Sequence, residues 1–264
     1  MRTPNLMAVT QRTMFVGWDP RDDLDARIAI RSMVRHCKRG IRVVLLKDHE
    51  LRRAGFYWRS YEVRPNGQRI DDIDGKPFST EFSFSRFCVP ELARAMGIRE
   101  PVLFTDPDIM LRADVNELFD CWDDQCAVMC VQHQHIPREQ TKFDGMQQTK
   151  YFRKNWSSVM LLHPERTREL TPHKVNTWRG SDLHAFLWAK DDEIGALPKE
   201  WNHLVGYNPP NPNAKLVHFT LGDPSFPGRE RDEHADEWRS YVAADEQDNP
   251  YAEIAKQSGM AVAQ

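Results

Sequence analysis

Two aspartates flank a proline in the stretch LFTDPDIML, residues 103–111. Asp106 and Asp108 directly follow an apolar run that predicts a buried strand, and buried carboxylates are costly unless a positive charge compensates them. Two carboxylates at this spacing converge on one hard divalent cation when the backbone turns between them. Pro107 stiffens such a turn because its ring fixes φ. The alternative is an ordinary surface turn, since Asp-Pro-Asp is common turn chemistry.

A histidine at the end of a second apolar run is the natural third ligand. His218 lies in KLVHFT, residues 215–220. Alone, a histidine in such a place is more often structural than a ligand. Together with Asp106 and Asp108 it gives the mixed oxygen and nitrogen set that Mn²⁺ accepts, with Mg²⁺ as a second candidate. The sequence therefore predicts a divalent metal site made of these three residues.

The bulk composition is that of an ordinary globular chain. Hydrophobic residues make up 40% and charged residues 28% of the 264 residues, which argues against extensive disorder. The formal charge of −3 gives no overall basic surplus for nucleic acid or membranes, although a local basic patch stays possible. No apolar run reaches the roughly 18 residues of a membrane span. The first residues lack the apolar core of a signal peptide, so we expect a cytoplasmic protein.

The five cysteines raise one competing metal hypothesis. An odd count without a secretion signal indicates reduced thiols. Three of them share a segment with two histidines: Cys121, Cys126, Cys130, His133 and His135. Their spacing fits none of the usual paired zinc motifs. We favour a buried strand over residues 126–131, in which cysteine behaves as a small apolar residue.

The elements that must position these residues alternate between strand and helix. Residues 13–18 predict a strand, residues 19–40 a helix with an apolar stripe, and residues 41–46 a second strand. Such alternation indicates a parallel sheet with helices packed on it. Residues 102–105 predict a third parallel strand. Asp106 then lies at its carboxyl end, where open α/β sheets bind ligands.

The remaining chain shows weaker patterns. Residues 57–80 are rich in polar and turn residues and predict an irregular segment. We expect helices at 82–97, 113–119 and 181–190, and strands at 127–132, 156–163, 193–198 and 215–220. These elements predict one domain over residues 13–242, preceded by a tail at 1–12. Residues 243–264 predict a second tail or a loosely docked segment.

The order of several short motifs resembles a known enzyme family. The helix with SRFCVPEL, the strand followed by DPD, then KNWSSVMLL and VHFT occur in the same order as in GT-A fold glycosyltransferases related to family 8. The resemblance covers roughly residues 13–230. It implies an α/β fold of Rossmann-like type, with a mixed, mainly parallel sheet flanked by helices. It also implies retaining transfer from a nucleotide sugar, with UDP favoured, and Mn²⁺ held against the donor diphosphate by Asp106, Asp108 and His218.

The same resemblance assigns further residues to the nucleotide. The first strand ends in VGWDP, which matches Asp19 to a hydrogen bond with uracil and Trp18 to stacking or pocket lining. Core packing is the alternative for Trp18. Asp106 is matched to the ribose as well as to the metal. Arg86 corresponds to an arginine near the donor sugar and phosphates, a task suited to a planar guanidinium, and a surface salt bridge is its alternative.

The segment RKNWSSVMLL corresponds to the strand beside the donor sugar. The resemblance matches Asn155 and Ser157 to sugar hydroxyls, and Lys154 and Arg153 to phosphate or acceptor. The alternative for these two cations is a solvated loop. Gly222 is matched to the diphosphate.

One position departs from the family pattern near that glycine. Asp223 stands where relatives have lysine, and the spacing from the histidine to the glycine is one residue longer. Arg229 and Arg231 are the candidate replacement cations.

Two mechanisms stay open at the reacting carbon. Asp182, in GSDLHAF, corresponds to an acidic residue of the relatives, and Asp191, Asp192 and Glu193 compete for the same role. As a nucleophile, Asp182 would give double displacement. We prefer front-face substitution, in which the departing phosphate accepts the acceptor's proton and the protein supplies positioning and electrostatics.

The sequence leaves the acceptor and the oligomeric state open. Residues 133–154 form a long polar loop of the kind that carries specificity, and the acceptor is a glycan, a protein or a nucleic acid. Two other function classes remain. A nucleotidyltransferase would show a glycine-rich basic loop after the first strand, where GWDPRDDLD is mostly acidic. A non-catalytic nucleotide-sugar or glycan-binding protein is the third.

Overall fold

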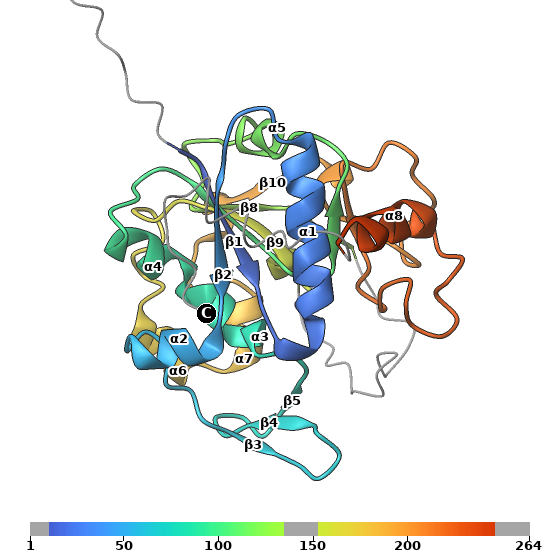
Figure 1. Ribbon diagram of the computed structural model, residues 1–264. Coiled ribbons are helices and arrows are strands. Elements are labelled where there is room, and N and C mark those ends of the chain that lie inside the picture. Colours follow the sequence, from blue (N-terminus) through green and yellow to red (C-terminus); the bar gives the residue numbers. More distant parts are fainter. Residues whose placement is uncertain (1–10, 135–152, 246–264) are drawn as a thin grey trace, which may run out of the picture.

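A computed structural model describes residues 11–134 and 153–245 of the chain (Figure 1). Its centre is a six-stranded sheet in the order β10-β8-β9-β6-β1-β2. The strands are β1 (Thr13–Gly17), β2 (Arg42–Leu46), β6 (Val102–Thr105), β8 (Val128–Cys130), β9 (Val159–Leu162) and β10 (Ile194–Ala196). β1 is parallel to both β2 and β6, and β10 is parallel to β8, whereas β9 runs antiparallel between β8 and β6. The predicted mixed, mainly parallel sheet is confirmed.

Helices cover both faces of this sheet, as predicted (Figure 1). They are α1 (Asp23–His36), α2 (Asp48–Arg53), α3 (Phe82–Ser85), α4 (Val89–Ala95), α5 (Val115–Phe119), α6 (Pro172–Thr177), α7 (Gly180–His184) and α8 (Ala235–Asp245). Short 3-10 turns join them: η1 (Pro20–Asp22), η2 (Arg86–Cys88), η3 (Trp156–Ser158), η4 (Asp191–Glu193) and η5 (Lys199–Asn202). The helix expected at 82–97 is the continuous run α3, η2 and α4. The helix expected at 181–190 is wrong beyond His184, where α7 ends.

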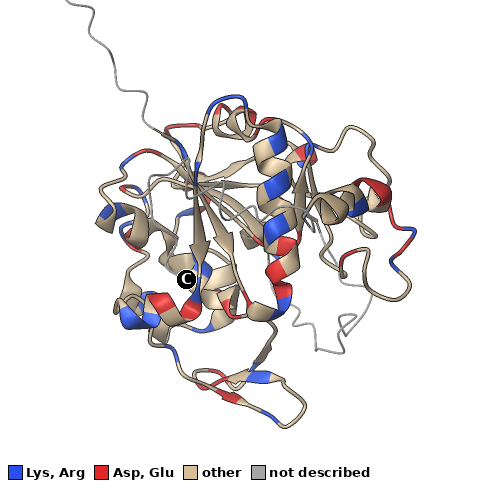
Figure 2. Cartoon of the chain, in the orientation of Figure 1, with Lys and Arg blue, Asp and Glu red and all other residues tan. Residues whose placement is uncertain are grey.

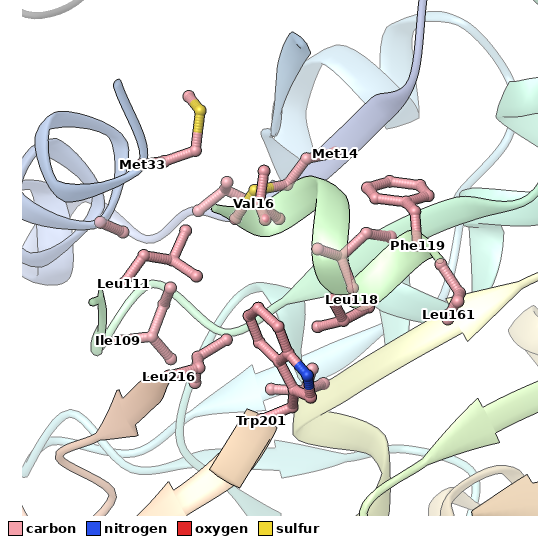
Figure 3. Packing of buried hydrophobic residues seen from close by; sticks show 14 of the residues in the cluster. Met14, Val16, Met33, Ile109, Leu111, Leu118, Phe119, Leu161, Trp201 and Leu216 are labelled. Atoms are coloured by element: carbon pink, nitrogen blue, oxygen red, sulfur yellow. The ribbon is translucent and has the colours of Figure 1, made fainter. Parts of the chain in front are cut away.

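Alternate residues of the buried strands feed two apolar clusters, one on each face of the sheet. Met14 and Val16 of β1 join one cluster with the inner face of α1, part of which Figure 3 shows. Phe15, between them, joins the other cluster together with Phe104 of β6. Successive side chains of a strand point to opposite faces, so strands this apolar must be covered on both. The resulting rigidity fixes the strand ends on which the polar residues stand.

A second sheet was not predicted. The chain enters it directly after the two aspartates. It has the order β11-β12-β7, with β7 (Ile109–Leu111), β11 (His203–Leu204) and β12 (Leu216–His218). The expected strand at 215–220 therefore belongs to this sheet and not to the central one. β7 pairs antiparallel with β12, which sets His218 opposite Ile109. The turn at residues 106–108 thus carries the chain from one sheet into the other.

A third small sheet corrects the expectation of an irregular segment at residues 57–80. It contains β3 (Tyr61–Val63), β4 (Arg69–Asp71) and β5 (Pro77–Phe78), and it projects at the bottom of Figure 1. These strands are too short and polar to show a period-two apolar pattern. The buried Arg59 guanidinium anchors the sheet, donating to both carboxylate oxygens of Asp71 at 2.8 and 2.6 Å.

The C-terminal part of the described chain also differs from expectation. α8 begins at Ala235 and crosses the predicted domain boundary at residue 242. Trp238 and Tyr241 are buried, and α8 packs beside α1. Among the residues the structure describes, no helix has the length and apolar character required to cross a bilayer.

Candidate functional site

A cavity of about 900 Å³ opens where β6 ends and β9 begins. Its wall combines Asp106 and Asp108 after β6, residues 154–158 before β9, and residues 220–223 after β12. The backbone N–H of Asp106 donates to the carbonyl of Ser158 at 2.8 Å, which joins the first two segments. The N–H of Phe219 donates to the carbonyl of Asp108 at 2.9 Å, which joins the third. Three distant parts of the sequence therefore meet at one edge.

The three predicted metal ligands lie together: Asp106 and Asp108 line the cavity, and the buried His218 stands beside them. Ligand atoms of Asp106, Asp108 and His218 all fall within 4.8 Å of one another. The Oδ1 atom of Asp108 is 3.2 Å from Nε2 of His218. Adjacent ligands of an octahedral ion bound at about 2.0–2.2 Å are separated by about 3 Å. The spacing of this pair therefore fits a divalent cation.

The chemistry of the donor set supports the same conclusion. Asn202 donates from Nδ2 to Ser158 Oγ at 3.0 Å, so its carbonyl oxygen faces His218 Nδ1, also at 3.0 Å. Nδ1 of the imidazole therefore carries a hydrogen, and Nε2, which faces Asp108, is the nitrogen that could bind a cation held by the carboxylates. Ser158 Oγ, which accepts from Asn202, in turn donates to the carbonyl of Asn155 at 2.7 Å.

Arg86 is the positive partner of the half-buried Asp106. Its Nη1 lies 2.8 Å from Asp106 Oδ1 and also donates to the Ser157 carbonyl at 2.9 Å. The guanidinium is buried and lies over the rings of Phe82 and Phe104. Arg86 also lines the cavity, so a solvent-exposed salt bridge does not describe it. Its predicted contacts with the donor sugar and phosphates stay predictions.

Four other predicted residues also line the cavity: Lys154, Asn155, Ser157 and Gly222. Lys154 is 8% exposed, so its ammonium group is held at the cavity instead of in bulk solvent. Asn155 has φ of 65° and Gly222 has φ of 116°, the left-handed region that Gly222 enters without a side-chain penalty. Arg153 does not line the cavity; it pairs with Asp191 at 2.6 Å.

Besides Arg153 and His218, three predicted residues are not among the described residues that line the cavity: Trp18, Asp19 and Asp182. Trp18 donates from Nε1 to Asp23 at 2.9 Å and packs on the core, which is the alternative given for it above. The Asp182 carboxylate accepts from Ser181 Oγ at 3.2 Å. The nucleotide and catalytic roles assigned to these residues stay predictions.

Asp19 is fully buried and holds Arg21, which does line the cavity. Its two oxygens accept from Nε and Nη2 of Arg21, both at 3.0 Å, and Oδ2 also accepts from the N–H of Glu81. Burial raises the pKa of Asp19, but the hydrogen bonds and charge of Arg21 outweigh burial and hold that pKa below its ordinary value. Asp19 is thus an ionised anchor for a cavity-lining arginine.

Sequence reasoning missed two further carboxylates beside the metal cluster. Asp25 and Asp223 line the cavity, and burial raises the pKa of Asp25 well above its usual range, with the charges of Asp223 and Asp108 adding to the effect. Figure 2 shows acidic residues at the end of α1 where the chain enters this helix. The sequence does contain a signal that Asp25 is buried, because it shares a helix face with the buried Ile28, Ala29 and Ser32.

A histidine of the cavity lining, His184, supports Ser157. Ser157 Oγ lies 2.7 Å from Nδ1 of His184. Burial lowers the pKa of His184 well below its ordinary value, and the nearby charges of Arg86 and Arg59 lower it further. His184 is therefore neutral at physiological pH. The sequence predicts a helix that contains His184. It gives no sign that this histidine contacts Ser157.

The competing zinc hypothesis finds no support among the described cysteines. Cys126 and Cys130 are buried, and burial raises the pKa of both thiols. Neither belongs to a metal-ligating group within the described residues. Cys130 ends β8, so the predicted buried strand is confirmed. His135 and most of the predicted acceptor loop, residues 135–152, lie outside the described residues.

Comparisons with solved structures define the fold class. The chain aligns with the bifunctional glycosyltransferase WbbM at a TM-score of 0.59 and 16% identity, over 96% of this chain and 52% of that one. It aligns with LgtC, in an active-site mutant, at 0.56 and 11% identity, over 88% and 95% of the two chains. GlyE of Streptococcus pneumoniae gives 0.53 and 14% identity, over 93% and 63%. The chain therefore has the GT-A type fold of glycosyltransferases and spans about half the length of WbbM.

A sequence relative defines the family. The chain is 40% identical over 233 residues to Protein CDI of Arabidopsis thaliana, which covers 85% of this chain and 83% of the relative. The chain belongs to the family of Protein CDI. No protein-family model matches the sequence.

Proposed function

We propose that this protein is a metal-dependent glycosyltransferase that uses a nucleotide-diphosphate sugar, with a UDP-sugar favoured. The observation that carries the proposal is the convergence of Asp106, Asp108 and His218 within 4.8 Å, with both carboxylates lining a large cavity. The GT-A type fold supports the proposal because other chains with this architecture are named as glycosyltransferases. The motif order, which resembles that of family 8, supports it as well.

The donor diphosphate would lie between the acidic cluster and the cavity cations. Bound at Asp106, Asp108 and His218, Mn²⁺ or Mg²⁺ would neutralise charge that develops on the leaving diphosphate. Arg86 and Lys154 line the same cavity and are the protein's own cations for the phosphate oxygens. Arg86 also fixes Asp106, so one guanidinium would orient a metal ligand and meet the donor.

The sugar would lie against the turn that precedes β9. Asn155 and Ser157 both line the cavity there and present amide and hydroxyl groups suited to sugar hydroxyls. The neutral His184 behind Ser157 fixes the orientation of that hydroxyl. Gly222 leaves room on the opposite segment for close approach of the diphosphate to the backbone.

We propose that transfer proceeds with retention by front-face substitution. Of the two mechanisms, double displacement needs a carboxylate at the anomeric carbon, and Asp182 is not among the described residues that line the cavity. The departing phosphate would accept the acceptor's proton while the new glycosidic bond forms on the same face. If Asp182→Asn abolishes transfer while donor affinity is kept, the nucleophile mechanism is favoured instead.

A thermal-shift panel of nucleotide sugars, with and without Mn²⁺, tests the proposal. We expect a UDP-sugar to raise the melting temperature only when Mn²⁺ is present, because the ion joins the diphosphate to the carboxylates. Asp108→Ala should abolish this gain. Asp182→Asn is the matched control, since it removes a carboxylate outside the cavity and should leave the gain unchanged.

The outcomes also separate the alternatives. Slow hydrolysis of the bound donor would establish catalysis and identify the sugar, whereas stabilisation without any turnover would indicate a non-catalytic binding protein. Formation of a nucleotide sugar from a nucleoside triphosphate would indicate a nucleotidyltransferase. No stabilisation by any nucleotide sugar would contradict the proposal.

A further inference from the structure

A second group of metal-ligating side chains lies outside the cavity, on the far end of the segment that follows His218. It consists of His203 on β11 and the adjacent pair Glu233 and His234 just before α8. Ligand atoms of the three residues all lie within 4.8 Å of one another. None of the three lines the cavity. This group is called the His203 cluster below.

The ligand atoms of the His203 cluster are close enough together to surround one tetrahedral ion. Nε2 of His203 is 2.8 Å from Glu233 Oε2, and Nε2 of His234 is 3.2 Å from Glu233 Oε1. Ligands bound to Zn²⁺ at about 2.0–2.2 Å with tetrahedral angles are separated by about 3.4 Å. The rings of His203 and His234 stand perpendicular, so their Nε2 atoms approach the carboxylate from different directions. A fourth position remains for water.

A hydrogen-bonded cluster without metal explains only part of this geometry. Glu233 Oε1 accepts the backbone N–H of Asn211 at 2.5 Å, and His203 forms a hydrogen bond with Oε2. His234 has a backbone hydrogen bond with Asn211, but its Nε2 atom is buried and does not donate to Glu233 Oε1, which lies 3.2 Å away. Its side chain is only 9% exposed. A buried polar nitrogen aimed at a carboxylate without donating to it is placed as a ligand would be.

The backbone is shaped to bring two adjacent side chains to one point. Neighbouring residues in extended chain point to opposite sides. His234 has φ of 65°, the left-handed region that a residue other than glycine adopts at a cost. That conformation turns its imidazole back onto Glu233. The carbonyl of His234 still accepts the N–H of Trp238 at 3.0 Å, so α8 begins directly after the turn.

We infer that the His203 cluster binds a transition-metal ion, with Zn²⁺ the best match, as a structural site separate from the cavity. Two imidazoles and one carboxylate suit Zn²⁺ better than the hard cations expected at two carboxylates. The ion ties β11 to the start of α8. It thereby anchors the far end of residues 219–234, whose Gly222, Asp223 and Phe226 line the cavity. Glu233, with 21% of its side chain exposed, gives the ion an entry path.

Metal content and cobalt spectroscopy test this inference without any activity assay. The full-length protein is loaded with Zn²⁺, dialysed against metal-free buffer and measured by elemental analysis. We expect about one equivalent of zinc to remain in the wild type and in Asp108→Asn, because a site with several protein ligands releases its ion slowly. Glu233→Gln and His203→Gln should retain less than about a tenth of that amount. Glu237→Gln is the matched control, since Glu237, in the first turn of α8, lies 3.9 Å from His234 Nδ1 but does not belong to the cluster.

Replacement by Co²⁺ keeps the test informative if a variant folds poorly. The wild type and Asp108→Asn should both give the visible absorption of a four-coordinate cobalt ion with nitrogen ligands. Loss of all zinc from the folded wild type on dialysis would overturn the inference. Zinc that disappears in Asp108→Asn but stays in Glu233→Gln would also overturn it, since the ion would then belong to the cavity.

Discussion

The two histidine–carboxylate clusters share a strand pair but differ in ligand type and surroundings. Asp106, Asp108 and His218 combine one imidazole with two carboxylates that line the cavity, whereas the His203 cluster has one carboxylate and two imidazoles, none of which lines it. β11 and β12 are hydrogen-bonded neighbours, and Asn202 and His203 are consecutive residues. The first cluster suits a hard ion, such as Mn²⁺ or Mg²⁺, that binds and dissociates together with the substrate. The second suits a borderline ion, such as Zn²⁺, that remains bound to the protein.

Two consecutive residues serve the two clusters. Asn202, the last residue of η5, contacts His218 of the cavity cluster, and His203, the first residue of β11, contacts Glu233 of the other. The two clusters share no ligand, so each can be changed without replacing a ligand of the other. The predictions below use this independence.

The largest effect is expected at Asp108. Asp108→Asn removes a charged ligand while it keeps the shape of the side chain. We expect a loss of about 10³-fold in donor turnover, since a metal supplies several kcal/mol of charge stabilisation to the transition state. Turnover in saturating Mn²⁺ measures this loss, and zinc retained at the His203 cluster is the internal control. Equal turnover in the variant and the wild type would show that Asp108 does not bind the catalytic metal.

A smaller loss is expected at Asn202, which acts only through His218. Asn202→Leu removes the acceptor that fixes the Nδ1–H tautomer, and we expect Mn²⁺ to bind roughly 10- to 100-fold more weakly. Titration of Mn²⁺ followed by electron paramagnetic resonance measures the affinity. Asn202→Asp keeps an oxygen acceptor toward the imidazole and should restore most of the binding. If Asn202→Asp binds as weakly as Asn202→Leu, the tautomer is not what Asn202 controls.

Burial of the Asp25 carboxylate, together with the nearby charges of Asp223 and Asp108, should lower the free energy of unfolding at neutral pH. Because the folded-state pKa of Asp25 is raised, the folded protein loses stability as pH rises above about 3.9, and the full penalty persists above the folded pKa. Asp25→Asn removes it, and we expect the chelated protein to melt about 2–4 °C higher at neutral pH, for about 1 kcal/mol. The gain should shrink in Mn²⁺, whose charge stabilises the Asp25 carboxylate. A melting temperature below that of wild type would contradict this account.

His184 offers an effect that appears only at acidic pH, and a contrast with the ligand histidines. Its folded-state pKa is lowered, so below about pH 6.5 the unfolded chain binds a proton that the folded protein does not. Stability therefore falls as pH drops through this window, by up to about 1.4 kcal/mol per pH unit for one group. Denaturant unfolding between pH 7 and 5.5 should show a shallower fall for His184→Gln. The other histidines are common to both proteins and cancel, so parallel curves would contradict the prediction.

Local patterns in the sequence were sufficient for the central sheet but not for the elements around the cavity. The apolar runs at residues 13–18, 41–46 and 102–105 predict parallel strands, and the structure confirms them. β7 was missed because its three residues directly continue the turn after Asp108. α8 was missed because only a few of its residues, Trp238 and Tyr241 among them, are buried. Weak periodicity and short length leave such elements to tertiary contacts.

Local sequence patterns were enough to select candidate site residues. Asp106, Asp108 and His218 were selected because acids and imidazoles at the ends of apolar runs are costly without a partner. Which of the candidates lie in contact depends on the tertiary structure. Pairing of β7 with β12 sets Asp108 beside His218, and the left-handed turn at His234 forms a second cluster that no spacing in the sequence indicates. The physical reason is that local preferences fix strands and turns, whereas contacts between residues 100 apart depend on packing of the whole chain.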